Sequence, residues 1–240
     1  MTDIVAVGTT PNYMRQLGFF DPSKHKDAAV TFVGVGGIGS FAATAVAKLG
    51  VPHIRLIDPD YVDDHNLPNQ MYDVADLGVS KVEAAAIAVR EAAGVEARTY
   101  RSSIGTDGWQ GDEIRGIGGI VVSGLDSMTA RHDLWHKAVK LNPAVPLLID
   151  CRLDAQIIHV YCVDPRNTED VAKYEQLTLY SDDEADDNSC TTRAVIDVGF
   201  TVGAQVARAV RRHYARLPNG KLTIINQETN VITTAEEWWA

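Results

Sequence analysis

The sequence contains few cysteines, and their spacing excludes two common uses of this residue. Cys151, Cys162 and Cys190 are the three in 240 residues, and no two of them form a Cys-x-x-Cys pair. An odd count without paired spacing argues against a disulfide scaffold and against a tetrahedral thiolate zinc site. We therefore expect reduced thiols and no zinc.

Long apolar runs and a leader-like beginning are also missing. No uninterrupted apolar stretch reaches about 18 residues, the length that predicts a membrane-spanning helix. The first residues lack the basic stretch and apolar core that a secretory signal combines. We expect a cytoplasmic protein that makes no use of a membrane.

Positive charge is scarce as well. The chain has 22 Lys and Arg against 32 Asp and Glu, which gives a formal net charge of -10 and a pI near 5.1. Nucleic acids and anionic membrane surfaces would repel such a protein, so general binding to either is not expected. Any site for a polyphosphate must therefore be built locally.

The pattern of apolar segments predicts an α/β fold. Buried strands are expected at 28–33, 53–57, 96–100, 119–123, 146–153 and 156–163, with helices through 49 and at 80–93, 129–141 and 192–216. A hairpin is expected at 221–226 and 230–234. This alternation predicts a Rossmann-like doubly wound sheet, mostly parallel, with antiparallel strands toward the C-terminal half.

We expect one domain with four parts. They are an N-terminal arm at 1–27, a nucleotide-binding core at 28–163, a long loop at 164–191 that carries Cys190, and a C-terminal helix and hairpin at 192–240. The arm places Tyr13, Met14, Leu17 and Phe20 roughly on one face, so we expect it to be packed. A second irregular stretch, 58–79, is long for a connection and is expected to be a functional loop.

A glycine-rich turn follows the first predicted strand. Gly34, Gly36 and Gly39 have the Gly-x-Gly-x-x-Gly spacing and open a helix, where glycines allow close backbone approach and the helix N-terminus attracts phosphate. Asp58 ends the second strand, where a carboxylate can accept hydrogen bonds from ribose hydroxyls. These residues favour nucleotide binding over a purely structural turn, but they fit an NAD-dependent oxidoreductase equally well.

Several motifs downstream separate these possibilities. They are Gly36-Gly37, Asp58-Pro-Asp60, Asn66-Leu-Pro-Asn-Gln70, Leu77-Gly-x-x-Lys81 and Leu125-Asp126-Ser-Met-Thr-Ala-Arg131. In this order they resemble the ThiF/MoeB and ubiquitin-activating-enzyme superfamily of ATP-dependent adenylating enzymes. The resemblance extends from Tyr13-Met-Arg-Gln16 to the helix after Cys190.

The resemblance implies roles for particular residues. Gly36 and neighbouring amides would cradle phosphates, Asp58 would hold the ribose, Asn66 and Lys81 would bind the triphosphate, and Asp126 would position magnesium. The implied cofactors are thus ATP and Mg²⁺. The complete nucleotide-binding set is Gly34, Gly36, Gly37, Gly39, Asp58, Asp60, Asn66, Asn69, Lys81 and Asp126.

The same resemblance implies a homodimer. Arg15, in the Arg-Gln pair of the arm, would reach the nucleotide site of the partner subunit, so that each site is composite. Together with Lys81 and Cys190 it forms the predicted catalytic set.

One residue departs from the family pattern. The family usually has arginine before the glutamine of the Asn-x-x-Arg-Gln element, and here Asn69 precedes Gln70. A charge-assisted phosphate donor is therefore missing at this place. Arg131 and Arg152 are hypothetical substitutes.

Cys190 matches the catalytic-cysteine position of the family. Its thiol would take the activated acyl group as a thioester or receive it in sulfur transfer, whereas Cys151 and Cys162 lie in apolar strands and are expected in the core. The predicted reaction is adenylation of a carboxylate, with the C-terminal glycine of a ubiquitin-like or sulfur-carrier protein as the implied substrate. The alternatives are a small-molecule or RNA-borne carboxylate without a cysteine intermediate, an NAD-binding oxidoreductase, and an inert nucleotide-binding module.

Overall fold

A computed structural model describes residues 11–104, 117–154, 156–180 and 195–238. Its centre is one eight-stranded sheet with the order β3-β2-β1-β4-β5-β6-β7-β8. The strands are β1 (Ala29–Val33), β2 (His53–Ile57), β3 (Arg98–Tyr100), β4 (Ile120–Ser123), β5 (Leu148–Asp154), β6 (Ile157–Val163), β7 (Leu222–Asn226) and β8 (Val231–Ala235). The first five strands in this order, β3, β2, β1, β4 and β5, run parallel to one another. Each of the last three, β6, β7 and β8, pairs antiparallel with the strand before it. The Rossmann-like prediction, including its antiparallel C-terminal half, is confirmed.

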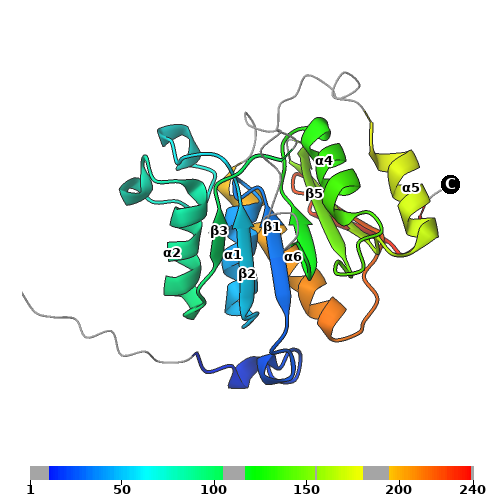
Figure 1. Cartoon of the computed structure of the whole chain (residues 1–240), viewed down its shortest axis with the longest axis horizontal. Coiled ribbons are helices and arrows are strands. Elements are labelled where there is room, and N and C mark those ends of the chain that lie inside the picture. The colour runs from blue at the N-terminus through cyan, green and yellow to red at the C-terminus, as the bar shows by residue number, and fades with distance from the viewer. Residues whose placement is uncertain (1–10, 105–116, 155, 181–194, 239–240) are drawn as a thin grey trace, which may run out of the picture.

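Helices cover both faces of the sheet (Figure 1). Helices α1 (Gly39–Lys48), α2 (Lys81–Ala93) and α6 (Ile196–Tyr214) bury alanine and valine side chains in one apolar core. On the other face, α4 (Met128–Leu134), its π-helical continuation Trp135–Val139 and α5 (Thr168–Thr178) pack around Trp135 and Tyr174. None of these helices is long and apolar enough to cross a membrane.

The strand order reverses between β1 and β4. Both strands run in the same direction, and their registers pair Val33 with Ser123 at the carboxyl ends. In doubly wound sheets the crevice for a ligand opens at such a reversal, because the connections leave toward opposite faces. The glycine turn after β1 and the Leu125–Asp126 turn after β4 flank this point.

One expectation about local structure is wrong, and another holds only in part. The segment after Asp164, expected to be a loop, contains α5, which Asn167 begins by accepting hydrogen bonds from the amides of Glu169 and Asp170. The arm is packed only in part, since Phe20 is buried in the core and Tyr13 is half-buried, while Met14 is 73% and Leu17 47% exposed. Its described residues form two short turns, Met14–Gln16 and Pro22–Lys24, which are too short to present a continuous apolar face.

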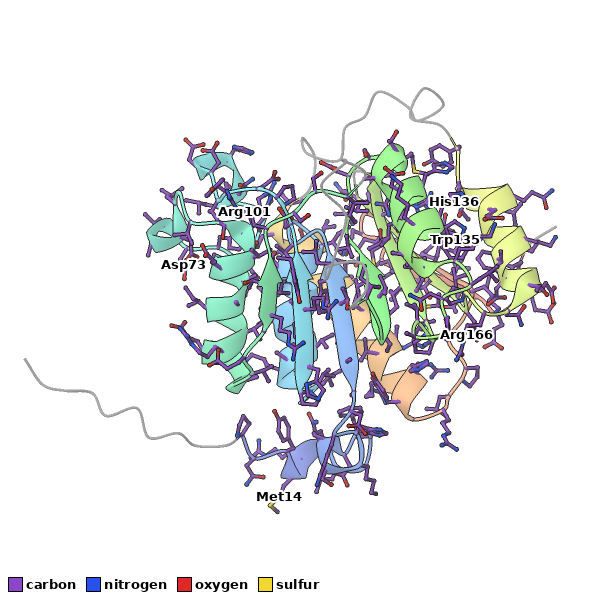
Figure 2. All side chains as sticks on the ribbon, viewed as in Figure 1. Met14, Asp73, Arg101, Trp135, His136 and Arg166 are labelled. Carbon is purple, nitrogen blue, oxygen red and sulfur yellow. The ribbon has the colours of Figure 1, made fainter. Side chains whose placement is uncertain are left out.

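The arm lies at the amino end of the parallel strands. In Figure 1 it occupies the lower end of the molecule, from which β1 runs upward. Gln16 Nε2 donates to the carbonyl of Leu49, at the end of α1, over 2.7 Å. Figure 2 shows Met14 on the arm at the opposite end of the molecule from Arg101.

Candidate functional site

A pocket of about 440 Å³ opens at the carboxyl ends of β1, β2 and β4. Nearly all of the predicted nucleotide-binding residues line it, although they come from segments far apart in the sequence. They are Gly34, Gly36, Gly37, Asp58, Asp60, Asn66, Asn69, Lys81 and Asp126. The sheet therefore brings the glycine turn, the lysine and the aspartate into one cavity.

Glycine is explained by the chain's own packing at Gly34 and Gly39, but not at Gly36. Gly34 has φ +85°, and a Cβ there would come within 2.6 Å of the Gly124 carbonyl oxygen, while a Cβ on Gly39 would overlap the Gly34 carbonyl. These two positions are required by the protein's own packing, and Gly39 does not line the pocket. At Gly36 the nearest atom to a Cβ is Gln70 Nε2 at 3.8 Å, so no protein atom demands glycine. Open space at Gly36 is what a phosphate cradle would leave.

Asp58 is held at the end of β2 by backbone amides. Its Oδ2 accepts from the Val35 amide over 2.8 Å, and its Oδ1 accepts from the Asp60 amide over 2.9 Å. Burial raises the pKa of this carboxyl, and the two amide hydrogen bonds oppose that rise. The arrangement fixes a carboxylate beside the glycine turn.

Lys81 is the first residue of α2, and its side chain is almost fully buried. Its Nζ lies 2.9 Å from Asp60 Oδ2, whose own side chain is 61% exposed. The Tyr72 hydroxyl donates to the Val35 carbonyl over 2.5 Å and lies 3.3 Å from the Lys81 carbonyl, which ties the glycine turn to the start of α2. The ammonium is thus positioned at a helix N-terminus, where an anion is favoured.

The polar loop 58–79 supplies amide groups to the pocket. Asn66 is buried, and its Oδ1 accepts from the Asp63 amide over 3.0 Å. Asn69 Oδ1 and Gln70 Oε1 are buried without a hydrogen-bond partner among the described residues. Buried polar atoms are rarely left unpaired, so these two amides fit a site whose ligand completes their hydrogen bonds. Gln70 was quoted within its motif but not predicted as a site residue.

Asp126 follows β4 and is exposed at the edge of the pocket. A carboxylate there is a suitable ligand for Mg²⁺, which prefers hard oxygen donors. The next residue, Ser127, caps α4 by accepting from the Ala130 amide over 3.1 Å.

The remaining predicted residues lie elsewhere. Arg15 lines a separate hollow with Lys48 and Ala93, at the end of the sheet opposite the pocket, so it does not contribute to the site of its own chain. Cys190 lies outside the described residues. Cys151 and Cys162 are buried, as expected, and burial raises the pKa of both thiols, that of Cys162 to about 12.

Arg131 and Arg152 do not replace the missing arginine. Both guanidinium groups bind the fully buried Asp150, and neither lines the pocket. Among its described residues, the lining has one lysine and no arginine against three aspartates. Asp150 is not among the residues predicted from the sequence, although an acidic residue inside an apolar strand indicates a buried ion pair.

Comparison with known proteins agrees with this geometry. The model of the ThiF family matches residues 12–235. The chain belongs to the ThiF family. Its fold is also similar to the solved structures of PaaA, at TM-score 0.70 and 19% identity over 97% of this chain and 84% of that one, and of Escherichia coli MccB with AMPCPP and MccA, at TM-score 0.65 and 17% identity over 91% and 66%.

Curated relatives of this ThiF-family chain match over shorter segments. The adenylyltransferase and sulfurtransferase MOCS3 of Drosophila grimshawi is 41% identical over 85 residues, 33% of this chain and 19% of the relative. The tRNA threonylcarbamoyladenosine dehydratase of Bacillus subtilis is 44% identical over 59 residues, 24% and 23% of the two chains. The ubiquitin-like modifier-activating enzyme 5 of Branchiostoma floridae is 33% identical over 95 residues, 39% and 24%. The matches thus cover about a quarter or less of each relative.

Proposed function

We propose that this ThiF-family protein activates a carboxylate by adenylation with ATP. The observation that carries the proposal is the meeting of the Gly36–Gly37 turn, Lys81 and Asp126 in one pocket at the strand-order reversal. An NAD-dependent oxidoreductase would account for the glycines and Asp58, but not for Lys81 and Asp126. The MccB structures with ATP and with AMPCPP share this fold, which supports a nucleotide triphosphate as the ligand.

The lining fits a nucleotide in three respects. The space at Gly36 allows phosphate oxygens to approach backbone amides. The side-chain amides of Asn69 and Gln70 each carry an NH₂ donor group beside the unpartnered oxygen, so they can donate to a phosphate or accept from a hydroxyl. Asp58 can accept hydrogen bonds from ribose hydroxyls with its remaining lone pairs.

Asp126 is the residue that we assign to Mg²⁺. The ion, when bound, would neutralise charge on the phosphate oxygens. An exposed carboxylate at the mouth of the pocket leaves further coordination positions for water and phosphate, as Mg²⁺ requires.

The proposed reaction joins the carboxylate to AMP. A carboxylate oxygen attacks the α-phosphorus, the bond from this phosphorus to the bridging oxygen of the leaving group breaks, and pyrophosphate departs with the electron pair. Negative charge spreads over the phosphate oxygens during this step, and the Lys81 ammonium is positioned to offset it. Asp60 Oδ2 lies 2.9 Å from that ammonium and holds it at the pocket.

The charge of the lining supports a composite site. Even with the Mg²⁺ assigned to Asp126, one lysine against three aspartates leaves much of the charge of a triphosphate uncompensated, which favours a further cation in the site. Arg15 cannot supply it within its own chain, because the arm lies at the opposite end of the sheet. We therefore propose a homodimer in which Arg15 of one subunit enters the site of the other.

We propose that the substrate is the C-terminal glycine of a ubiquitin-like or sulfur-carrier protein. We also propose that the reaction takes place in the cytoplasm. This choice is supported by the similarity to the adenylyltransferase and sulfurtransferase MOCS3 and to the ubiquitin-like modifier-activating enzyme 5. The Cys190 thiol would then take the acyl group from AMP. The dehydratase relative favours a second candidate, a carboxylate carried on RNA, which needs no cysteine.

A direct test is incubation with ATP, Mg²⁺ and a panel of carboxylates that includes a ubiquitin-like protein with a free C-terminus. We expect pyrophosphate from the adenylation step and, with the protein substrate, release of AMP together with an adduct that thiols release. Cys190→Ala should abolish the adduct and the AMP release that accompanies it but not ATP–pyrophosphate exchange, whereas Cys162→Ala, the matched control, should retain all three. Binding of ATP without pyrophosphate exchange for any carboxylate would favour an inert nucleotide-binding module, and stabilisation by NAD but not ATP would refute the proposal.

A further inference from the structure

A buried ionic network lies behind the pocket, and none of the proposed chemistry uses it. Its centre is Asp150 on β5, which is 0% exposed. The Asp150 carboxylate accepts from Arg131 of α4, from Arg152 Nε over 2.9 Å and from the Tyr174 hydroxyl of α5 over 3.0 Å. Asp150 is thus the meeting point of three elements.

Stability alone is a weak reason for such a network. Burial by itself raises the pKa of the Asp150 carboxyl, but the guanidinium groups of Arg131 and Arg152 outweigh burial and hold this pKa below its ordinary value. The carboxylate is therefore charged, and its two partners are buried cations. Well-packed apolar side chains of similar volume usually stabilise a core at least as well as a buried ion pair does.

The two arginines reach from Asp150 to different places. Arg131 donates through Nη1 to Ser123 Oγ over 3.2 Å, and through Nη2 to the carbonyls of Cys151, over 3.0 Å, and Leu125. Arg152 instead donates to the Thr178 carbonyl at the end of α5 over 2.7 Å. Only Arg131 of this pair touches the turn that follows β4.

The hydrogen bond from Arg131 to the Leu125 carbonyl also restrains the next residue, Asp126. The carbonyl of Leu125 belongs to the peptide unit that joins Leu125 to Asp126, and a peptide unit is planar. Fixing this carbonyl therefore fixes the orientation in which the backbone enters Asp126. On the other side of Asp126, Ser127 is fixed as the cap of α4.

We propose that Arg131, held by Asp150, is a positioning residue that orients Asp126 for the metal of the nucleotide complex. This inference rests on the proposed function. Asp126 lies on an exposed turn, and without the clamp its carboxylate would sample more directions before binding a cation. Residues behind a metal ligand commonly change metal affinity about 10- to 100-fold when they are mutated.

Arg131→Lys and Arg152→Lys form a matched pair of variants. Each keeps the positive charge that Asp150 requires, and each loses the planar fork that reaches Asp150 and a second acceptor together. Both substitutions disturb the same buried carboxylate. They differ in the second acceptor, which is the turn before Asp126 for Arg131 and the end of α5 for Arg152.

The test is titration of the full chain with Mn²⁺ in the presence of AMPCPP, with free Mn²⁺ measured by electron paramagnetic resonance. We expect Arg131→Lys to weaken Mn²⁺ binding about 10-fold while Arg152→Lys stays within about 2-fold of the wild type. The half-saturating Mg²⁺ concentration for pyrophosphate exchange should rise for Arg131→Lys, and saturating Mg²⁺ should restore its rate. Unchanged Mn²⁺ affinity in folded Arg131→Lys, or equal weakening in both variants, overturns the inference.

Two further outcomes are distinguishable. If Arg131→Lys fails to fold, Arg131→Gln combined with Asp150→Asn and Arg152→Gln removes all three buried charges together and should show the same loss of Mn²⁺ affinity; normal affinity there overturns the inference as well. A wild-type protein that binds no Mn²⁺–AMPCPP overturns the proposed function itself. Wild-type binding with an unaffected Arg131→Lys leaves the proposed function standing and rejects only the positioning role.

Discussion

Replacing Gly36 by alanine should separate nucleotide binding from folding. A Cβ at this position would be 3.8 Å from the nearest atom of the chain, which is an ordinary van der Waals distance. Gly→Ala at a compatible backbone position commonly stabilises by about 0.4–1 kcal/mol, because the unfolded chain loses freedom. For a chain of this size that corresponds to a rise in Tm of up to roughly 4 °C.

Gly34→Ala should instead lower the stability of the fold. Its backbone conformation, φ +85°, disfavours side chains, and a Cβ would come within 2.6 Å of the Gly124 carbonyl oxygen. The backbone term alone costs about 1–3 kcal/mol. We therefore expect Tm to fall by roughly 2–12 °C, and further if the Gly124 turn cannot move. Gly78→Ala, at φ +79° with no atom within 4 Å, is the matched control for backbone strain without overlap.

The assay is thermal unfolding with and without ATP and Mg²⁺. At ATP concentrations near 100 times Kd, the wild type should gain about 2.7 kcal/mol of stability. In Gly36→Ala a methyl group enters the pocket between the turn and Gln70, where we place phosphate. A tenfold loss of affinity would remove about 1.4 kcal/mol of that gain. The reasoning is refuted if Gly36→Ala keeps the full ATP-induced shift, or if it unfolds as readily as Gly34→Ala.

Four other outcomes are expected. Lys81→Met should lower the rate of pyrophosphate exchange about 10²- to 10³-fold, with little change in Tm because its partner Asp60 is 61% exposed; an unchanged rate would contradict the assigned role. Mixing inactive Arg15→Ala with inactive Lys81→Met should restore about a quarter of wild-type activity if the sites are composite, and no recovery would argue against Arg15 acting on a partner. The depressed pKa of Asp150 means that its stabilisation is present above the ordinary aspartate pKa of about 3.9 and is lost as pH falls toward the folded-state value. Asp150→Asn should therefore unfold with a free energy about 3–5 kcal/mol lower than that of the wild type near pH 7. In urea titrations this difference in unfolding free energy should narrow below about pH 4; a difference that does not change with pH would contradict the charged state of Asp150. Cys151 and Cys162 should react with DTNB only after unfolding, because burial raises the pKa of each thiol; fast labelling of either in the native protein would contradict its buried position.

The parallel part of the fold was predictable from the sequence. Strand β1 is a mostly apolar segment that ends before Gly34 and is buried at four of its five positions, a composition typical of a strand that helices cover on both faces. Strand β2 follows Pro52 and interrupts its buried apolar residues with His53 and Arg55, and the prediction for His53–Ile57 agrees with it residue for residue. The pocket followed from the same logic, since motif residues at the carboxyl ends of neighbouring parallel strands must meet.

Helix α5 was missed for a physical reason. Its sequence is mostly polar, and among its eleven residues only Val171 and Tyr174 are buried apolar side chains. Hydrophobic periodicity is weak in such a helix, so the informative signal was the Asn167 cap followed by Glu169 and Asp170. The partly exposed arm is a related case, because turns of three residues each are too short to bury a continuous apolar stripe.

The contacts of the two arginines were beyond the sequence. Arg131 and Arg152 belong to different elements, and nothing in their spacing indicates that both bind Asp150. Their direction is set by the β4–β5 pairing and by the packing of α4 and α5 against the same face. Contacts between side chains of different elements, such as these, arise only once the sheet and its helices have assembled.

A crystal structure of the protein with AMPCPP and Mg²⁺ tests the central claim most directly. We predict that the phosphates lie against the backbone of Gly36 and Gly37, that Lys81 contacts a phosphate oxygen, and that Asp126 lies in the coordination shell of the metal. Density for the nucleotide in any other cavity, or phosphates beyond the reach of both Lys81 and Asp126, would contradict the account.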